Sequence, residues 1–196
     1  MQYVGHLDLH KSWERSFRRS GLQLSYSLGF HPQPRINLAC ALPLGFTSQS
    51  EIIDAWIEDD LTVDVIKETL NRALPPGLNI HSVEKVDFTA PSLQTQVISS
   101  IYLVTFLDDV ADLNERIQCI SSSEHIYRQR RGKSYDLRPL IESINLYSPD
   151  ETGRSRIRLE LSAREAATGR PEEVLDEIGI KFENTRIHRE KLTFRD

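Results

Sequence analysis

The chain has 196 residues, a formal net charge of −5 and 39% hydrophobic residues. This length suffices for one medium domain or two small ones with real cores, and the acidic balance argues against a general nucleic-acid coat protein. Cys40 and Cys119 lack disulfide or metal spacing, which indicates a reducing compartment and predicts two small buried thiols. Without a leader or an apolar run near twenty residues, we expect a cytoplasmic protein with no membrane partner.

The first half opens with an amphipathic helix. Leu9, Trp13 and Phe17 recur at four-residue spacing and predict a buried stripe, with Leu7 nearby, on a helix over residues 6–20. The glycine that follows is expected to close this helix in the left-handed conformation. Alternating and periodic apolar residues then predict strands 23–28, 36–40 and 50–58, helix 62–74 and strand 78–86.

Two prolines interrupt the segment Tyr26–Arg35, between the first two of these strands. Each residue that precedes a proline is pushed towards extended backbone, so residues 30–35 cannot be helical. Gly29 is the one position free to take a positive φ. We therefore expect a stiff loop that displays His31, Gln33 and Arg35, which is typical of a recognition surface.

The second half repeats the alternation of strands and helices. Its predicted elements are strand 101–107, helix 112–121, strands 126–131, 141–146 and 157–161, a helix from Pro171, and strand 184–194. In the last strand, strict alternation places Ile187 and Arg189 on one face and His188 and Leu192 on the other.

Each half reads as strand, helix, two strands, helix, strand. We therefore predict an α+β protein of two ferredoxin-like βαββαβ halves with antiparallel sheets, residues 1–90 and 91–196. The first half lacks its opening strand, because residues 1–4 are too few for a core strand. This predicts either a sequence truncated at its N-terminus or an open sheet edge.

Positive charge gathers in two segments that lie far apart in the sequence. The first is the early helix with the proline loop, and the second runs from Arg128 to Arg138. Both segments are also compatible with an ordinary solvated surface. Asp136 and Arg138 are expected to form an ion pair with a structural role. The candidate residues for binding RNA or a protein partner are Arg15, Arg18, Arg19, Phe30, His31, Arg35, Arg128, Arg130, Arg131, Lys133 and Arg138.

No motif for a metal, a cofactor or a covalent catalyst is present. The six histidines are scattered, and phosphate-binding loops, dinucleotide fingerprints and cluster-binding cysteines are absent from the sequence. We therefore predict no cofactor and no catalytic residue, and we favour a protein without enzyme activity. His31 with Arg35 is compatible with a metal-independent ribonuclease, although a lone exposed histidine more often only makes hydrogen bonds.

Several motifs along the chain resemble those of the radical SAM-linked protein family, a domain of unknown function. The motifs are His6-Leu-Asp8, the Arg15…Arg18-Arg19 helix, Tyr26–Arg35, Ala41-Leu-Pro-Leu-Gly45, Leu74-Pro-Pro-Gly77, Lys133–Pro139, Gly169-Arg-Pro-Glu-Glu173 and Ile187-His-Arg189. Members of that family occur beside a radical SAM enzyme or fused to its C-terminus. The resemblance thus implies a radical SAM enzyme as partner, and the family's neighbouring ribonuclease and ribosomal-protein genes imply RNA metabolism.

The leading hypothesis is a non-catalytic accessory module that binds RNA for a radical SAM enzyme. Arginines would contact phosphates, and Tyr26, Phe30 or Tyr127 would stack on bases. The alternative is a protein–protein adaptor that docks the enzyme without RNA, and the third reading is the metal-independent ribonuclease.

Overall fold

The computed structural model describes residues 2–195. The chain divides into two compact units. The first unit comprises residues up to 45 together with 52–94, and the second comprises residues 46–51 together with 95 onwards. Both units combine helices with antiparallel strand pairs, so the predicted α+β class is confirmed.

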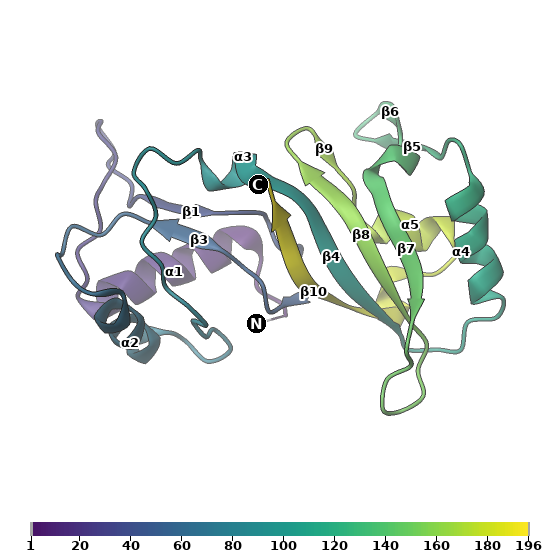
Figure 1. Ribbon diagram of the computed structural model, residues 1–196, viewed down its shortest axis with the longest axis horizontal. Helices are drawn as coiled ribbons and strands as arrows, with labels where there is room; N and C mark the ends of the chain where they lie inside the picture. Colours follow the sequence, from purple (N-terminus) through teal and green to yellow (C-terminus); the bar gives the residue numbers. More distant parts are fainter. Residues whose placement is uncertain (1, 196) are drawn as a thin grey trace. The chain divides into compact units, whose positions relative to one another are not determined.

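The first unit packs two helices against a small antiparallel strand pair (Figure 1). Its elements are α1 (His6–Ser20), β1 (Ile36–Leu38), β3 (Ile53–Ala55) and α2 (Val63–Ala73), and α3 (Leu93–Gln96) lies at the boundary with the second unit. Leu9, Trp13 and Phe17 of α1 are buried in its core, as predicted. Leu7 is 74% exposed, so its expected place beside that stripe was wrong. Gly21 ends α1 with φ 78°, as expected.

Two strands predicted for this unit are reduced or absent. Residues 23–28 contribute only the isolated bridges of Leu24 with Ile57 and of Tyr26 with Pro34. Residues 78–86 form no strand, because side chains of α2 take up the backbone groups that a ladder would use. Ile80 N donates to Asn71 Oδ1 (3.1 Å), and Lys67 Nζ donates to the carbonyl oxygen of His81 (2.6 Å).

The second unit is built on a mixed sheet with strand order β2-β10-β4-β8-β7, in which only β2 is parallel to its neighbour. Its strands are β2 (Thr47–Ser48), β4 (Val97–Phe106), β7 (Ile141–Tyr147), β8 (Arg156–Arg164) and β10 (Thr185–Phe194), and the short β9 (Ala167–Thr168) pairs with β8. Helices α4 (Leu113–Ser122) and α5 (Pro171–Glu177) lie on one face of the sheet (Figure 1). The order β4-α4-β7-β8-α5-β10 is the predicted βαββαβ order, with an extra hairpin, β5 (Tyr127–Arg130) and β6 (Lys133–Asp136), inserted after α4.

The core of the second unit lies between the sheet and the two helices. Val104, Ile157, Leu159 and Leu175 are fully buried there. A register shift between Arg189 and Lys191 breaks the alternation of β10. As a result Leu192 faces the core together with Ile187 and Arg189, which corrects the expected assignment of Leu192 to the other face.

The two thiols are less buried than expected. Cys119 is exposed on α4 and Cys40 is half-buried, so the prediction of two core cysteines was wrong. None of the helices within residues 2–195 has the length and apolar character needed to cross a bilayer.

Candidate nucleic-acid interface

The proline segment of the first unit forms a hydrogen-bonded hairpin. Ser27 N donates to the carbonyl oxygen of Gln33 (2.8 Å), and Arg35 N donates to that of Ser25 (2.9 Å). The Ser27 hydroxyl accepts a third bond from Gln33 N (3.0 Å). Gly29 has φ 137°, a conformation that disfavours any residue with a side chain. The non-helical loop predicted from the prolines is therefore present, and its backbone is hydrogen-bonded on both sides of its tip.

Large apolar side chains at the tip of this hairpin face solvent. Leu28 and Phe30 are each 102% exposed, and Tyr26 is 57% exposed. His31 is also exposed. Apolar side chains are rarely left fully exposed together on an ordered turn unless they serve binding, because their burial is favourable.

Arg35 lies at the base of the hairpin against two aromatic rings. Its guanidinium carbon is 4.4 Å from the ring centroid of Trp56 and 5.7 Å from that of Phe88, which is 80% exposed. These cation–π contacts fix the side chain. Among residues 2–195 the Arg35 guanidinium makes no ion pair. Trp56 and Phe88 were not among the predicted site residues, because both lie far from Arg35 in the sequence and their neighbouring residues give no sign of the contact.

The basic face of α1 is only partly available. Arg15 and Arg18 are exposed. Arg19 instead donates two hydrogen bonds from Nε and Nη2 to the carbonyl oxygen of Ala73 (3.1 and 2.6 Å), at the end of α2. Arg19, although also exposed, therefore stabilises the contact of the two helices, and Arg15 and Arg18 are the better candidates for contacting a ligand.

The second predicted basic segment, in the second unit, is largely engaged in internal contacts. Arg128 donates to Asp176 (2.6 Å) and to the carbonyl oxygen of Glu173 (2.8 Å). The guanidinium of Arg138 donates to three carbonyl oxygens, those of Ser121, Ser123 and Ile141. These contacts attach the β5–β6 hairpin to α5 and the segment after it to α4.

Arg130 makes the most extensive of these attachments. It donates from Nε to Glu173 Oε1 (2.9 Å) and from Nη2 to Glu173 Oε2, and its guanidinium stacks on Tyr135 at 4.7 Å. The neighbouring Arg131 and Lys133, at the hairpin turn, are exposed. Of the five second-segment candidates, only these two present their charge to solvent without such contacts.

The Arg130 pair makes the stability of the second unit depend on pH. Burial alone would raise the pKa of Glu173, but hydrogen bonds from Arg130 and Tyr135 outweigh it and hold the pKa below its ordinary 4.5. A folded-state pKa below the unfolded one gives stabilisation that is complete above the unfolded value and is lost as the pH falls through the folded value. Arg130→Ala should therefore cost about 1–3 kcal/mol at pH 7 and less at pH 3.

Urea unfolding followed by circular dichroism at both pH values checks this expectation. Arg131→Ala, the exposed neighbour, is the control and should unfold like the wild type at both. A stability gap between wild type and Arg130→Ala that is the same at pH 7 and pH 3 would contradict the role of Glu173.

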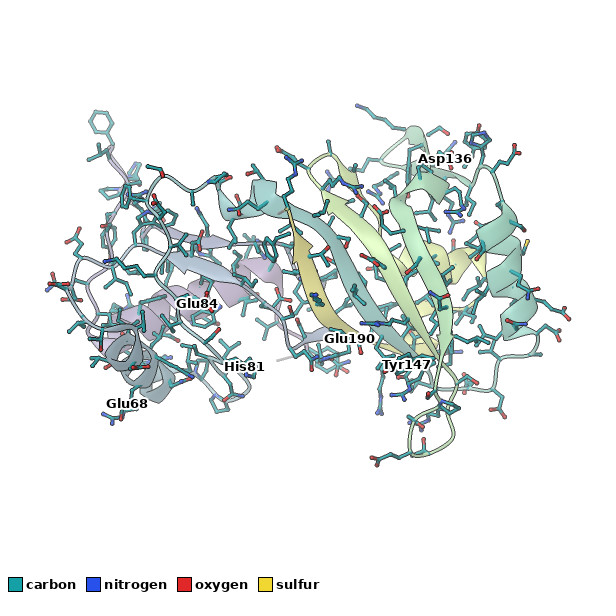
Figure 2. All side chains as sticks on the ribbon, in the orientation of Figure 1. Glu68, His81, Glu84, Asp136, Tyr147 and Glu190 are labelled. Carbon is teal, nitrogen blue, oxygen red and sulfur yellow. The ribbon has the colours of Figure 1, made fainter. Side chains whose placement is uncertain are left out.

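Asp136, labelled in Figure 2, does not pair with the guanidinium of Arg138 as expected. Its carboxylate accepts hydrogen bonds from His125 Nδ1 (2.8 Å), Ile126 N (2.9 Å) and the backbone N of Arg138 (3.0 Å). The His125 bond is the largest cause of its lowered pKa, followed by the bond from Ile126 N. Asp136 thus fixes the backbone at both ends of the hairpin, and the Arg138 side chain reaches the carbonyl oxygens instead.

The structure brings Phe30, His31 and Arg35 together in one hairpin. Arg15, Arg18 and Arg19 belong to the same unit, and Arg128, Arg130, Arg131, Lys133 and Arg138 belong to the other unit. In the part of the chain that the structure describes, no three His, Cys, Asp or Glu side chains gather as a metal site.

Fold and geometry together define an α+β protein whose strand pairs are antiparallel except at β2. The chain belongs to the DUF2344 family, described as an uncharacterized protein conserved in bacteria, whose match covers residues 1–171. A comparison with curated proteins finds no match. Among solved structures, a chain from the crystal structure of a Cbf5-Nop10-Gar1 complex is similar with a TM-score of 0.47 and 9% identity. The alignment covers 96% of this chain and 46% of that one, so this chain spans less than half its length.

Proposed function

We propose that this chain is a non-catalytic accessory module of a radical SAM enzyme and that it binds RNA through its first unit. The link to a radical SAM enzyme rests on the resemblance of its motifs to the radical SAM-linked family. The observation that carries the RNA-binding proposal is Phe30, fully exposed at the tip of a hydrogen-bonded hairpin that has Arg35 at its base.

The hairpin surface, as we name Tyr26, Leu28, Phe30, His31 and Arg35, has the two components that single-stranded RNA requires. Exposed rings offer faces on which unpaired bases stack, at about 1–3 kcal/mol per base. A guanidinium stacked on a ring, as that of Arg35 is on Trp56, would bind a phosphate oxygen through its in-plane N–H groups. Because the backbone is already fixed by hydrogen bonds, binding would not have to order it.

The exposed arginines of α1 would add phosphate contacts that are not specific for sequence. Each contact to a single strand contributes about 0.7 to the slope of log K against log salt. Arg15 and Arg18 are the candidates, because Arg19 is engaged with α2. Arg128, Arg130 and Arg138 are left out of the proposed surface for the same reason, since internal partners already occupy their guanidiniums.

Phe30→Ala is expected to weaken binding of a single-stranded oligoribonucleotide by about fivefold to a hundredfold, because it removes a stacking face. Phe30→Trp should retain the affinity, whereas Phe30→Leu should lose it, since only the aromatic replacement can stack. Fluorescence anisotropy at several salt concentrations measures both affinity and slope. The matched control is Tyr3→Ala, which removes another exposed ring of this unit (81% exposed).

The same variants separate the alternatives. If Phe30→Leu keeps co-purification with a radical SAM enzyme of the same genome while RNA binding is absent throughout, the protein is an adaptor that inserts an apolar tip into its partner. If the wild type shortens the RNA and His31→Ala does not, it is a ribonuclease. Unchanged RNA affinity in both Phe30→Ala and Arg35→Ala would reject the hairpin surface.

A further inference from the structure

An open surface pocket of about 460 Å³, called the phosphate cavity below, lies in the second unit beside the loop that joins β7 to β8. Figure 1 shows this loop projecting beyond the strand ends, and Figure 2 labels Tyr147 where the loop begins. The charged and polar side chains of its lining are Asp150, Glu151, Thr152, Arg154, Arg156 and Arg186. None of these residues is among the candidates predicted from the sequence.

Strand register places two of the arginines on one face of the sheet. Arg156 of β8 and Arg186 of β10 both lie opposite Thr105 of β4, one on each side of it. Adjacent strands are about 4.8 Å apart, so the two Cα atoms are separated by about 10 Å. Both side chains line the same open pocket.

Arg156 is held in position before any ligand arrives. Its Nε donates to the carbonyl oxygen of Ser148 (2.7 Å) and its Nη2 donates to that of Pro149 (3.0 Å). Its guanidinium also lies over the ring of Tyr147 at 5.2 Å. The remaining nitrogen, Nη1, takes no part in these bonds. A fixed guanidinium with an unused edge is well suited to bind an oxyanion.

The carboxylate of Asp150, in the loop between β7 and β8, accepts hydrogen bonds from residues of the same loop. Asp150 Oδ1 accepts from Thr152 N (2.9 Å), from the Thr152 hydroxyl (2.7 Å) and from Arg154 N (2.9 Å). Gly153, at φ 82°, completes the turn. Glu151 remains as the one other carboxylate of the lining, against three arginines. Within residues 2–195, none of these three guanidiniums lies within ion-pair distance of a carboxylate.

We propose that this cavity binds a phosphate group between Arg156 and Arg186, with Arg154 at its rim. Planar guanidinium groups match the oxygens of phosphate in bidentate geometry, and two of them lining one pocket supply more than one charged donor to the same tetrahedral anion. This site goes beyond the proposed function, because it requires neither the hairpin surface nor RNA. The phosphate could belong to a small phosphorylated ligand or to a nucleic-acid backbone, and the experiment separates these sources.

The test uses the full chain with pyrophosphate as probe, titrated by calorimetry at constant ionic strength. Arg186→Ala is expected to weaken binding about tenfold or more, because it removes one of the two charged groups that face the anion. Arg156→Ala should have a similar effect. Arg164→Ala is the matched control, because Arg164 lies on the same strand as Arg156 but pairs with Glu142 instead. Phe30→Ala should bind pyrophosphate as the wild type does, which distinguishes failure here from failure of the proposed function.

A second arm identifies the source of the phosphate. If Arg186→Ala weakens binding of an oligoribonucleotide as well as of pyrophosphate, the site receives backbone phosphate. If it weakens pyrophosphate binding alone, the site receives a small phosphorylated ligand. Absence of pyrophosphate binding to the wild type, or equal binding by wild type, Arg186→Ala and Arg156→Ala, overturns the proposal.

Discussion

Glu51→Ala should lower the free energy of unfolding of the second unit by about 3–5 kcal/mol, because it removes one partner of a buried ion pair. The Arg189 side chain is 1% exposed, and its Nη1 donates to both carboxylate oxygens of Glu51 (2.9 and 3.1 Å). Its Nη2 donates to the Tyr102 hydroxyl (3.3 Å). Since the Glu51 side chain is 21% exposed, we expect a value near the lower end of this range.

Urea unfolding followed by circular dichroism measures this loss. The matched control is Glu142→Ala, which breaks the more exposed pair with Arg164 and should cost less than about 1 kcal/mol. The double variant Glu51→Leu/Arg189→Met should recover much of the stability, because removing both charges also removes the desolvation cost. Equal stabilities of Glu51→Ala and Glu142→Ala would contradict a structural role for the buried pair.

Trp13→Ala should destabilise the first unit by about 3–5 kcal/mol, because it leaves a large cavity in a small core. Trp13 is 7% exposed and packs against Phe17, with ring centroids 6.4 Å apart. The chain has two tryptophans, and both belong to the first unit. In the variant, fluorescence of Trp56 therefore still reports the unfolding of this unit alone.

Leu7→Ala on the same helix provides the control for Trp13→Ala. Leu7 is 74% exposed, so its truncation should change stability by no more than about 0.5 kcal/mol. A loss in Leu7→Ala as large as that in Trp13→Ala would mean that α1 does not bury the face described above.

The two proposed ligand sites differ in how far they could be predicted from the sequence. The hairpin surface is partly predictable from it, because prolines and a glycine constrain the backbone locally and predict that His31 and Arg35 are displayed. Tyr26 and Leu28 were instead predicted on a half-buried strand, and the structure shows both exposed. The phosphate cavity is not predictable from the sequence, because Arg156 and Arg186 become neighbours only when β8 and β10 flank β4. Alternation along β8 places Arg156 on the solvent side, and that was the one local signal available for it.

The arginines likewise differ in how well the sequence predicts their surroundings. Arg15 and Arg18 lie on the polar face that the periodicity of α1 predicts, and they are exposed there. Arg130 is a candidate ligand residue in the sequence, yet it binds Glu173, which is 43 positions away along the chain. A partner so far away in the sequence cannot be inferred from the residues that neighbour Arg130.

By itself, the sequence determined the α+β class, helix α1 with its buried stripe, the non-helical proline loop and the order of elements in the second unit. Only the tertiary structure decided which candidate arginines have internal partners, that residues 78–86 bond to α2 instead of forming a strand, and that Arg189 is buried beside Glu51, 138 positions away. The physical reason is that apolar periodicity and backbone restriction act over a few neighbouring residues. A charge, in contrast, is satisfied by whichever group the folded chain brings within about 3 Å of it.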